Sequence, residues 1–475
     1  MSLAPWSLEL ATTTLMVVVL VVDVLARHGK KLIWGCYLVG TVALLAIAFF
    51  SRGQAEILGG TYVADGLSWI AKIIIVIGAG LTGAISMSAL SIREKYHGAY
   101  AALLLAASLG MMVLVSSKEL ITLFVGLETS SVSLYGLAAI SKRDDLSLEA
   151  GIKYLVIGAL SSGLLLYGLS IVYVSTGTTS LDAIRGAVSA RGRGPLLTAS
   201  VVFVLLGVGF KLSMVPLHVW TPDVYQGAPT PVSAFISVVS KSAGFVFALR
   251  LLSFAFADLR LVWEPLLAAA AVLTMTVGNL VAIPQKNVKR LLAYSSISQA
   301  GYILVGFVGS PAFGASAVMF YLLVYTLTNV AAFSVVIAFS QATGSDQLDD
   351  YAGLARREPL LALAFVFALL SLAGIPPLGG FVGKFYLFAA AMQKGYLWLV
   401  IVAALNSILS LYYYLLVLRR MYITDPAVPA VPMKTAFPVR AVLLITTVGI
   451  FWLGILPGPV MNVISEISAR IFPNM

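Results

Sequence analysis

The stretch 209–245, GFKLSMVPLHVWTPDVYQGAPTPVSAFISVVSKSAGF, contains the features that decide the fold. It places Lys211 and Lys241 in long apolar sequence, with Met214-Val215-Pro216 between them. An X-Pro pair stops an α-helix, because proline lacks a main-chain N–H and restricts the residue before it. Since the apolar run 197–226 is longer than one membrane crossing, the stretch predicts a membrane helix that is broken beside a buried charge.

The composition extends this prediction to the whole chain. The 475 residues are 60% hydrophobic and 11% charged, with a mean hydropathy of +0.99, whereas a soluble domain is roughly 45–50% apolar. The sequence therefore predicts an all-α polytopic membrane protein without a soluble domain. Apolar runs give about fourteen spans, near 6–26, 31–50, 64–91, 97–116, 118–140, 147–175, 197–226, 230–253, 261–283, 288–309, 313–340, 358–394, 396–420 and 437–457.

A second long run, 358–394, is interrupted by GIPPLGG at 374–380. The two broken helices are spans 7 and 12, five apart, which is the spacing expected of two five-helix repeats (spans 4–8 and 9–13). Because five is odd, the second repeat would be inverted relative to the first. The expected divisions are 1–96 for helices 1–3, 97–253 for the first repeat, 254–420 for the second, and 421–475 for helix 14 and the tail.

The basic residues favour one orientation. The net charge is +10, but Lys and Arg are spread over short loops. This distribution reflects the orientation of the helices in the membrane and does not indicate a nucleic-acid surface. They are more frequent after odd-numbered spans, so we expect those loops in the cytoplasm and both termini outside. The first apolar run lacks a basic flank and is expected to be a retained helix. The loop 176–196 is expected to lie outside, with a short surface helix at Leu181–Val188.

Four charged residues fall inside apolar runs at similar depth: Glu128 in LFVGLETSSVSLYG (123–136), Lys211, Lys241 and Lys384. A charge at mid-bilayer costs roughly 2.5–3.5 kcal/mol, so such residues face a protein interior or water. Four groups at one depth predict a polar layer parallel to the membrane. Since burial and a neighbouring carboxylate act in opposite directions on the charged form of lysine, the layer could pass protons along it. Inert buried ion pairs are the alternative.

Other polar residues in the runs admit two interpretations each. Lys72, beside Trp69, favours a snorkelling side chain, and Lys153 could pair with Glu149 four residues earlier. His218 could continue the relay or serve as a hydrogen-bonded residue at the break. Tyr294, the nearby serines and Gln299 could hold ordered water, although serine in a membrane helix is also a close-packing residue.

Three segments resemble one family, the antiporter-like membrane subunits of complex I and of the multisubunit sodium/proton antiporters. They are 209–245, NVKRLLAYSSISQAGY at 287–302, and LAGIPPLGGFVGKFYLF at 372–388; the resemblance covers roughly spans 4–13. The third is most similar to a branch with lysine, where another branch has glutamate, at position 384. The resemblance implies that Glu128, Lys211, Lys241 and Lys384 handle protons, with His218, Lys153 and Tyr294 as connectors. Many relatives have histidine at the position of Gln299.

The resemblance also implies that NADH, flavin, iron–sulfur clusters and quinone bind to other subunits. The sequence agrees, since it has a single cysteine, Cys36, three scattered histidines and no glycine-rich nucleotide motif. We expect no cofactor and no metal in this chain. The implied partners are other membrane-arm subunits of complex I, including antiporter-like subunit M and small subunit K, and the lipid bilayer of a bacterial cytoplasmic membrane.

The expected function is proton translocation as one subunit of a respiratory NADH-quinone oxidoreductase, a translocase whose redox chemistry takes place elsewhere. Two alternatives use the same lysines without that complex: a component of a multisubunit cation/proton antiporter, or of a membrane-bound hydrogenase. A further alternative is a structural membrane subunit whose buried charges do not pump.

Overall fold

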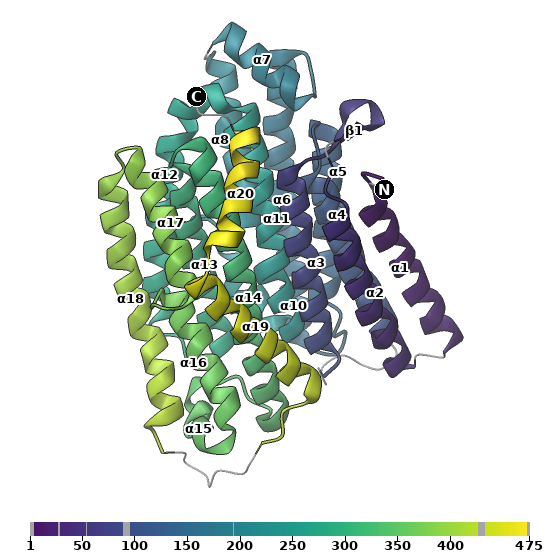
Figure 1. Ribbon diagram of the computed structural model, residues 1–475, viewed down its shortest axis with the longest axis vertical. Coiled ribbons are helices and arrows are strands. Elements are labelled where there is room, and N and C mark those ends of the chain that lie inside the picture. The colour runs from purple at the N-terminus through teal and green to yellow at the C-terminus, as the bar shows by residue number, and fades with distance from the viewer. Residues whose placement is uncertain are drawn as a thin grey trace.

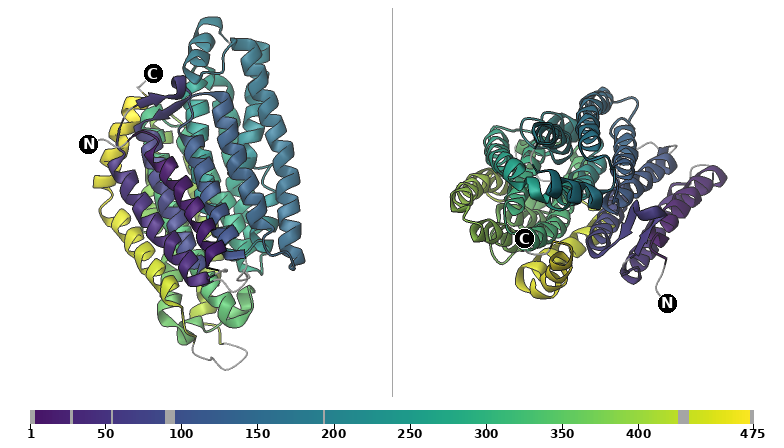
Figure 2. Two further views of the ribbon diagram at one scale, coloured as in Figure 1. Left: turned by 90° about the vertical axis from the view of Figure 1, so that its right-hand side faces the viewer. Right: turned by 90° about the horizontal axis from the view of Figure 1, so that it is seen from above.

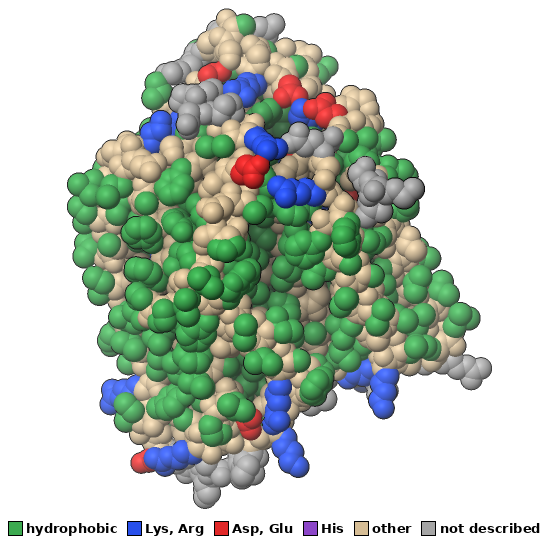
Figure 3. Space-filling view, viewed as in Figure 1, with side chains coloured by type: hydrophobic (Ala, Val, Ile, Leu, Met, Phe, Trp, Pro, Cys, Tyr) green, Lys and Arg blue, Asp and Glu red, His purple; other side chains and the backbone are tan. Residues whose placement is uncertain are grey.

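The computed structural model describes residues 4–26, 29–53, 55–88, 96–192, 194–425 and 433–472, which form a bundle of helices (Figure 1). Among these residues, twelve helices are long and apolar enough to cross a membrane. Hydrophobic side chains cover the middle of the bundle, and charged ones gather toward its two ends (Figure 3). This distribution is that of a membrane protein, whose outer surface meets lipid.

The N-terminal part packs as three helices with a small hairpin. Strands β1 and β2 pair antiparallel, with Glu56 opposite Val63. Seen from above, α1 and α2 lie at one edge of the bundle and α18 at the opposite edge (Figure 2). The elements are α1 (Ser7–Leu25), α2 (Lys30–Phe50), β1 (Ala55–Ile57), η1 (Leu58–Gly60), β2 (Tyr62–Ala64) and α3 (Gly66–Ser86).

The next group ends in a continuous helical segment, 230–255, that changes between α and π geometry. The expected surface helix is confirmed as α7. The elements are α4 (His97–Val115), α5 (Leu120–Ala138), α6 (Asp145–Thr176), α7 (Leu181–Arg191), α8 (Pro195–Leu212), α9 (Trp220–Gly227), α10 (Thr230–Phe235), π-helix η3 (Ile236–Ser240), α11 (Lys241–Ala248) and π-helix η4 (Leu249–Ala255).

The remaining elements continue the bundle to the C-terminus. They are η5 (Ala257–Leu259), α12 (Arg260–Ala282), α13 (Val288–Phe307), α14 (Pro311–Thr343), η6 (Leu348–Tyr351), α15 (Leu354–Arg357), α16 (Pro359–Ala373), α17 (Gly379–Gln393), α18 (Leu397–Tyr422), α19 (Phe437–Ile455) and α20 (Gly458–Ile471).

The twelve apolar helices are fewer than the fourteen spans expected from sequence, for two reasons. Helix α13 lies inside the bundle against α9, α12, α14 and α17, but its serines and Gln299 lower its hydropathy. The run 358–394 divides into α16 and α17, of 15 residues each, and each is too short to count as a full crossing.

Both expected breaks are found, and they end their helices in the same way. Helix α8 stops at Ser213, whose φ is +59°, and α16 stops at Gly374, whose φ is +89°. Beyond each stop, a main-chain N–H reaches five residues back: Met214 donates to the carbonyl of Gly209 at 2.8 Å, and Ile375 to that of Leu370 at 3.0 Å. A left-handed residue followed by this bond closes a helix end, and proline prevents its continuation.

The start of α5 is joined to the segment that follows the long helix α6. The N–H of Leu120 donates to the carbonyl of Thr179, and that of Leu181 to the carbonyl of Lys118, both at 2.9 Å. We name this pair of bonds the first clip. Its counterpart, the second clip, joins the start of α13 to the segment after α14: Val288 donates to Asp346 at 2.9 Å and Leu348 to Lys286 at 2.7 Å.

The two clips lie at opposite ends of the bundle. Residues just after the end of α5 (Ser141, Asp144) line one hollow together with Asp346 of the second clip and Lys289 in the first turn of α13, so α5 ends where α13 begins. The other end holds the first clip, the hairpin and both chain ends, since Ser7 contacts Ser51 and Ile467 packs at Gly66. Figure 1 shows N and C at this same end.

Candidate functional site

Lys211 is buried in the last turn of α8, where three elements meet. Its Nζ atom lies 3.3 Å from the hydroxyl oxygens of Ser130 and Ser131 on α5. Its aliphatic stem rests on Gly244 of α11, where a β-carbon would lie only 3.1 Å from Cγ of Lys211. The glycine therefore lets the lysine pass within one helical turn of Lys241.

Glu128 approaches Lys211 without touching it. Its carboxylate accepts a hydrogen bond of 2.5 Å from Ser162 on α6, and it forms no direct ion pair with Lys211. A pocket of about 10 Å³, lined by Ser131, Ser162 and Lys211, lies between α5, α6 and α8. That volume holds about one water molecule, and Ser162, which binds the Glu128 carboxylate, lines the pocket together with Lys211.

Lys241 is the most buried of the three expected lysines, with 1% of its surface exposed. It follows directly on π-helix η3, a geometry often found at functional sites. Its Nζ atom donates to the main-chain oxygen of Ser296 at 2.8 Å and to the hydroxyl of the same residue at 2.6 Å. Within the described chain, Lys241 has no carboxylate partner.

A set of hydroxyl groups and one amide continues from Ser296 across the bundle. The Ser296 hydroxyl lies 2.7 Å from the hydroxyl of Tyr325, whose ring stacks on that of Tyr321. Tyr321 donates to Oε1 of Gln299 at 2.5 Å, and Gln299 donates to the carbonyl of Leu372 at 2.8 Å, immediately before the α16 break. Gln299 thus connects α13, α14 and the second broken helix.

Lys384, on α17, is the last member of a series that begins at Glu128. We name this series the row; its members are Glu128, Lys211, Lys241, Ser296, Tyr325, Tyr321, Gln299 and Lys384. Its Nζ atom donates to the carbonyl of Ala373 at 3.1 Å and lies 4.1 Å from the centroid of the Tyr302 ring, a cation–π contact. The Tyr302 hydroxyl accepts from Asn279 at 3.2 Å. In Figure 1, α5 and α17 lie toward opposite sides of the bundle with α11 and α13 between them, so the row runs across the helices.

Two of the expected connectors, Lys153 and His218, form no hydrogen bond or ion pair with the series of buried residues in the part of the chain that the structure describes. Lys153 pairs with Glu149 and Asp223, each at 2.7 Å, and its side chain is 40% exposed. Asp223 also binds Arg290 at 2.8 Å. The i,i+4 pair weighed from sequence is present, as part of an ion network at the bundle edge. The other is His218, which lies in the turn between α8 and α9 with a buried Nδ1 atom that has no hydrogen-bond partner among the described residues.

Tyr294 is partly buried on α13 and packs against the hydrophobic core. No hydrogen bond joins its hydroxyl to the row in the part of the chain that the structure describes. Of the four expected connectors, Gln299 alone is hydrogen-bonded into the row.

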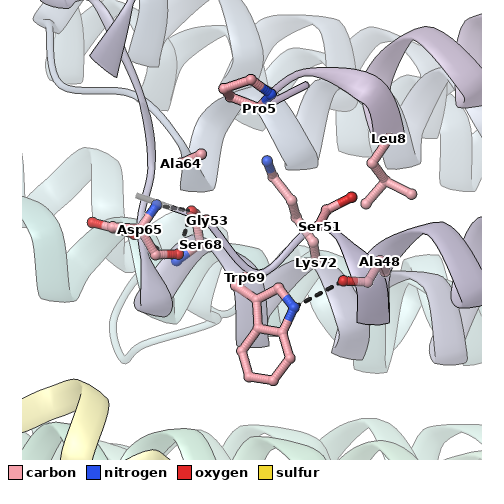
Figure 4. A pocket seen from close by; sticks show the side chains of 10 residues that line it. All are labelled: Pro5, Leu8, Ala48, Ser51, Gly53, Ala64, Asp65, Ser68, Trp69 and Lys72. Atoms are coloured by element: carbon pink, nitrogen blue, oxygen red, sulfur yellow. Dashed lines mark hydrogen bonds between the residues drawn. The ribbon is translucent and has the colours of Figure 1, made fainter. Parts of the chain in front are cut away.

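The snorkelling interpretation of Lys72 is wrong. Lys72 is buried, and its amine lies 2.7 Å from both Oε1 of Glu9 and the hydroxyl of Tyr62; Tyr62 in turn donates to Glu9 at 2.5 Å. The carboxylate comes from α1, far away in sequence, and it compensates the charge inside the bundle. Figure 4 shows the Lys72 amine in a small pocket, with Trp69 at one side.

A hollow of about 410 Å³ opens at the end of the bundle that holds the second clip. Lys289 lies in it, 6% exposed, and donates to the carbonyl of Ala228 at 3.0 Å, with Oδ2 of Asp346 at 3.8 Å. Two helical turns further along α13 is Ser296, the partner of Lys241. Tyr225 reaches the same serine, with its hydroxyl 3.3 Å from the Ser296 hydroxyl. We name this hollow the vestibule.

Sequence reasoning missed the tyrosines of the row and Lys289. Tyr321 and Tyr325 stand four residues apart in a very apolar run, a spacing that places both hydroxyls on one face. That spacing was the available signal. Lys289 looked like a loop charge because it stands at the start of α13. No group of three metal-ligating side chains is gathered among the described residues.

Comparisons with known proteins agree with this architecture. The curated NADH-quinone oxidoreductase subunit N of Moorella thermoacetica is 45% identical over 467 residues, covering 98% of each chain. A chain of respiratory complex I from Thermus thermophilus is 34% identical, with a TM-score of 0.82, covering 96% of this chain and 98% of that one. A chain of the Mrp complex from Dietzia sp. has a TM-score of 0.86 at 23% identity, a likeness of fold alone, covering 99% and 98%.

Two broken helices and a row of buried lysines across the bundle define the class of antiporter-like membrane subunits. The family model for NADH:quinone oxidoreductase/Mrp antiporter transmembrane proteins matches residues 117–410. The chain belongs to this family.

Proposed function

We propose that this chain is an N-type, proton-translocating membrane subunit of a NADH-quinone oxidoreductase. It carries proton transport, and the redox chemistry belongs to other subunits. The name and full-length similarity of the Moorella thermoacetica relative support the assignment. The observation that carries the mechanism is the series of contacts from Lys241 through Ser296, Tyr325, Tyr321 and Gln299 toward Lys384.

Protons enter the row from the vestibule. Lys289 and Ser296 are seven residues apart on α13, so both side chains lie on one face. Lys289 stands in the vestibule, and Ser296 binds Lys241. A water chain along this face, beside Tyr225, supplies Lys241 with a proton from the side where the vestibule opens.

From Lys241 the proton can move toward Lys384, through the contacts named above, or toward Lys211. The second route is short, because Lys211 packs on Gly244 one turn from Lys241. Beyond Lys211 lies the pocket for one water, and Ser162 on its wall binds Glu128. Burial disfavours a charged lysine, and a nearby carboxylate favours it. Protonation or deprotonation of Glu128 therefore shifts the proton along the row. We assign Glu128, Lys211, Lys241 and Lys384 as the proton-handling residues.

The architecture we propose has fourteen crossings, with α13 and the broken pair α16–α17 completing the twelve apolar helices. Two inverted five-helix repeats occupy 97–253 and 254–420, after three helices in 1–96 and before the last crossing and tail in 421–475. The matching clips at opposite ends and the matching helix stops at Ser213 and Gly374 support the inversion.

The orientation follows from the loop charges. We place the vestibule end in the cytoplasm of a bacterial cell and the end with the hairpin and both termini on the outer side of its cytoplasmic membrane. The partners would be the other membrane-arm subunits, with antiporter-like subunit M and small subunit K as neighbours. No cofactor is assigned to this chain.

The test is Lys211→Ala in the intact complex, with proton pumping, NADH-quinone electron transfer and assembly measured in the same membranes. Both activities should fall about tenfold or more per assembled complex, as on removal of a positioned proton-transfer group. Lys394→Ala, an exposed site on the outer end, is the control. Wild-type activity of assembled Lys211→Ala would show that the buried charges are structural, and transport that requires sodium would favour a cation antiporter.

A further inference from the structure

A second hollow, of about 330 Å³, lies at the hairpin end of the bundle. It is formed where the end of α2 and the start of α3 meet the end of α20, which is far away in sequence. Arg52, Trp69 and Arg470 line it, together with Gly53 and the apolar Ile467 and Ile471. We name it the arginine hollow.

The arginine hollow is positively charged. The guanidinium of Arg52 lies 5.2 Å from the centroid of the Trp69 ring and, within the described chain, has no carboxylate partner. Arg470 is bonded to Glu466 one turn earlier at 2.6 Å, with 63% of its side chain exposed. Glu466 therefore pairs with one of the two guanidinium groups, and Arg52 keeps its donors free for an oxygen-rich anion.

The hollow sits at the boundary of the hydrophobic belt. Phe49 and Phe50, 54% and 75% exposed, end α2, and Arg52 follows after Ser51. Figure 3 shows basic side chains along the upper edge of the hydrophobic surface. The indole N–H of Trp69 donates to the carbonyl of Ala48 at 2.8 Å, which fixes the ring (Figure 4). Tryptophan and arginine above exposed aromatic residues mark the headgroup depth of a bilayer.

We infer that the arginine hollow binds the phosphate headgroup of an anionic diacyl lipid. The guanidinium groups of Arg52 and Arg470 take the phosphate oxygens, since the planar fork of arginine matches phosphate geometry. Trp69 forms the wall beside the headgroup. The acyl chains lie against the exposed aromatic surface of α2. Because α20 supplies Arg470 and α2 supplies Arg52, the lipid fastens the C-terminal helix to the N-terminal helices.

The proposal is tested on the whole purified complex. Delipidated complex is titrated with phosphatidylglycerol, with phosphatidylcholine and with free glycerol phosphate, and bound lipid is counted by native mass spectrometry. The wild type should retain phosphatidylglycerol over phosphatidylcholine, and Arg52→Gln with Arg470→Gln should reduce retention about tenfold, as expected on losing two charge-assisted contacts. Lys394→Gln, which removes a basic residue at the same end, should retain the lipid as the wild type does.

Three results would overturn the inference. The double variant could retain as much phosphatidylglycerol as Lys394→Gln does. Free glycerol phosphate could displace the lipid at equal concentration, which would make the site one for a soluble anion. A photoreactive amino acid in place of Gly53 could crosslink to a neighbouring subunit and not to lipid. None of these results depends on proton pumping, so failure here leaves the proposed function standing.

Discussion

The Nζ atom of Lys241 lies 2.6 Å from the hydroxyl oxygen of Ser296 and 2.8 Å from its main-chain oxygen. The most buried lysine of the row is therefore held by one neutral residue. A lysine opposed by a carboxylate would be fixed in its charged form, whereas one held by a hydroxyl can give its proton away and take it back.

Ser296→Ala should slow proton pumping about tenfold. The charged amine of Lys241 loses its hydrogen bond to the Ser296 hydroxyl, and such bonds of charged groups are worth about 1.5–3 kcal/mol. Tyr325 loses its contact with the same hydroxyl. Ser298→Ala is the matched control, since the hydroxyl of Ser298 donates to the main chain of its own helix. Pumping is measured per assembled complex. Equal activities of the two variants would contradict the role of Ser296.

Gln299→Leu should reduce pumping while the complex still assembles, because leucine keeps the volume but cannot join Tyr321 to the carbonyl of Leu372. Gln299→His should restore it, since imidazole accepts and donates at the same place. The ratio of protons pumped to electrons transferred distinguishes the two variants. A Gln299→Leu complex with the wild-type ratio would place the proton route elsewhere.

Lys289→Gln should lower coupled electron transfer several-fold, because the vestibule loses its buried charge beside Asp346. Lys286→Gln, three residues away and exposed, serves as control. Turnover is measured in sealed vesicles with the vestibule side accessible. If the two variants behave alike, the vestibule is not where protons are taken up.

Lys72→Met should destabilise the N-terminal helices by about 3–5 kcal/mol, because it leaves the carboxylate of Glu9 buried without its cation. Glu9→Gln combined with Lys72→Met should recover most of that loss, since the double variant has no unpaired charge. Assembly yield and the temperature of dissociation report the difference. An equal loss in the single and double variants would show that the pair acts through packing and not through charge.

Gly380→Ala should prevent correct formation of the second break. A β-carbon at this position would overlap with the main-chain oxygen of Ser371, a contact no side chain can adopt. Gly163→Ala in α6, where nothing lies within 4 Å, should be neutral. Little assembled complex is expected for the first variant and a wild-type amount for the second. Normal assembly of Gly380→Ala would mean that the two halves of the helix can shift apart.

Sequence alone located the buried lysines, because the cost of a charge in lipid makes Lys211, Lys241 and Lys384 stand out in apolar runs. It also located both breaks, since proline and glycine act on the main chain locally. The same reasoning failed for Lys72, whose partner Glu9 is far away along the chain, and it found only one of the two partners of Lys153: Glu149, four residues earlier, but not Asp223. Burial alone cannot tell a paired charge from an unpaired one before the partners are known.

Residue type alone could not distinguish the tyrosines of the row from tyrosines that only pack in the core. Tyr321 and Tyr325 are aromatic residues in an apolar helix, where packing is the ordinary role. The contacts of their hydroxyls with Gln299 and Ser296 on α13 become visible only in the folded structure. The polar residues of α13 that make these contacts also lower its hydropathy, so α13 is not among the twelve apolar helices.

The two clips restrict which movements can change access to the row. In many transporters, one group of helices rocks against another as a rigid body. Here each clip joins two segments of the same repeat, Lys118 to Leu181 in the first and Lys286 to Leu348 in the second, so rocking of one repeat against the other would leave both clips intact. The clips instead hold α5 and α13 to their own repeats, each at its starting end. Each repeat is therefore stiffened at one face of the membrane, and the two repeats are stiffened at opposite faces.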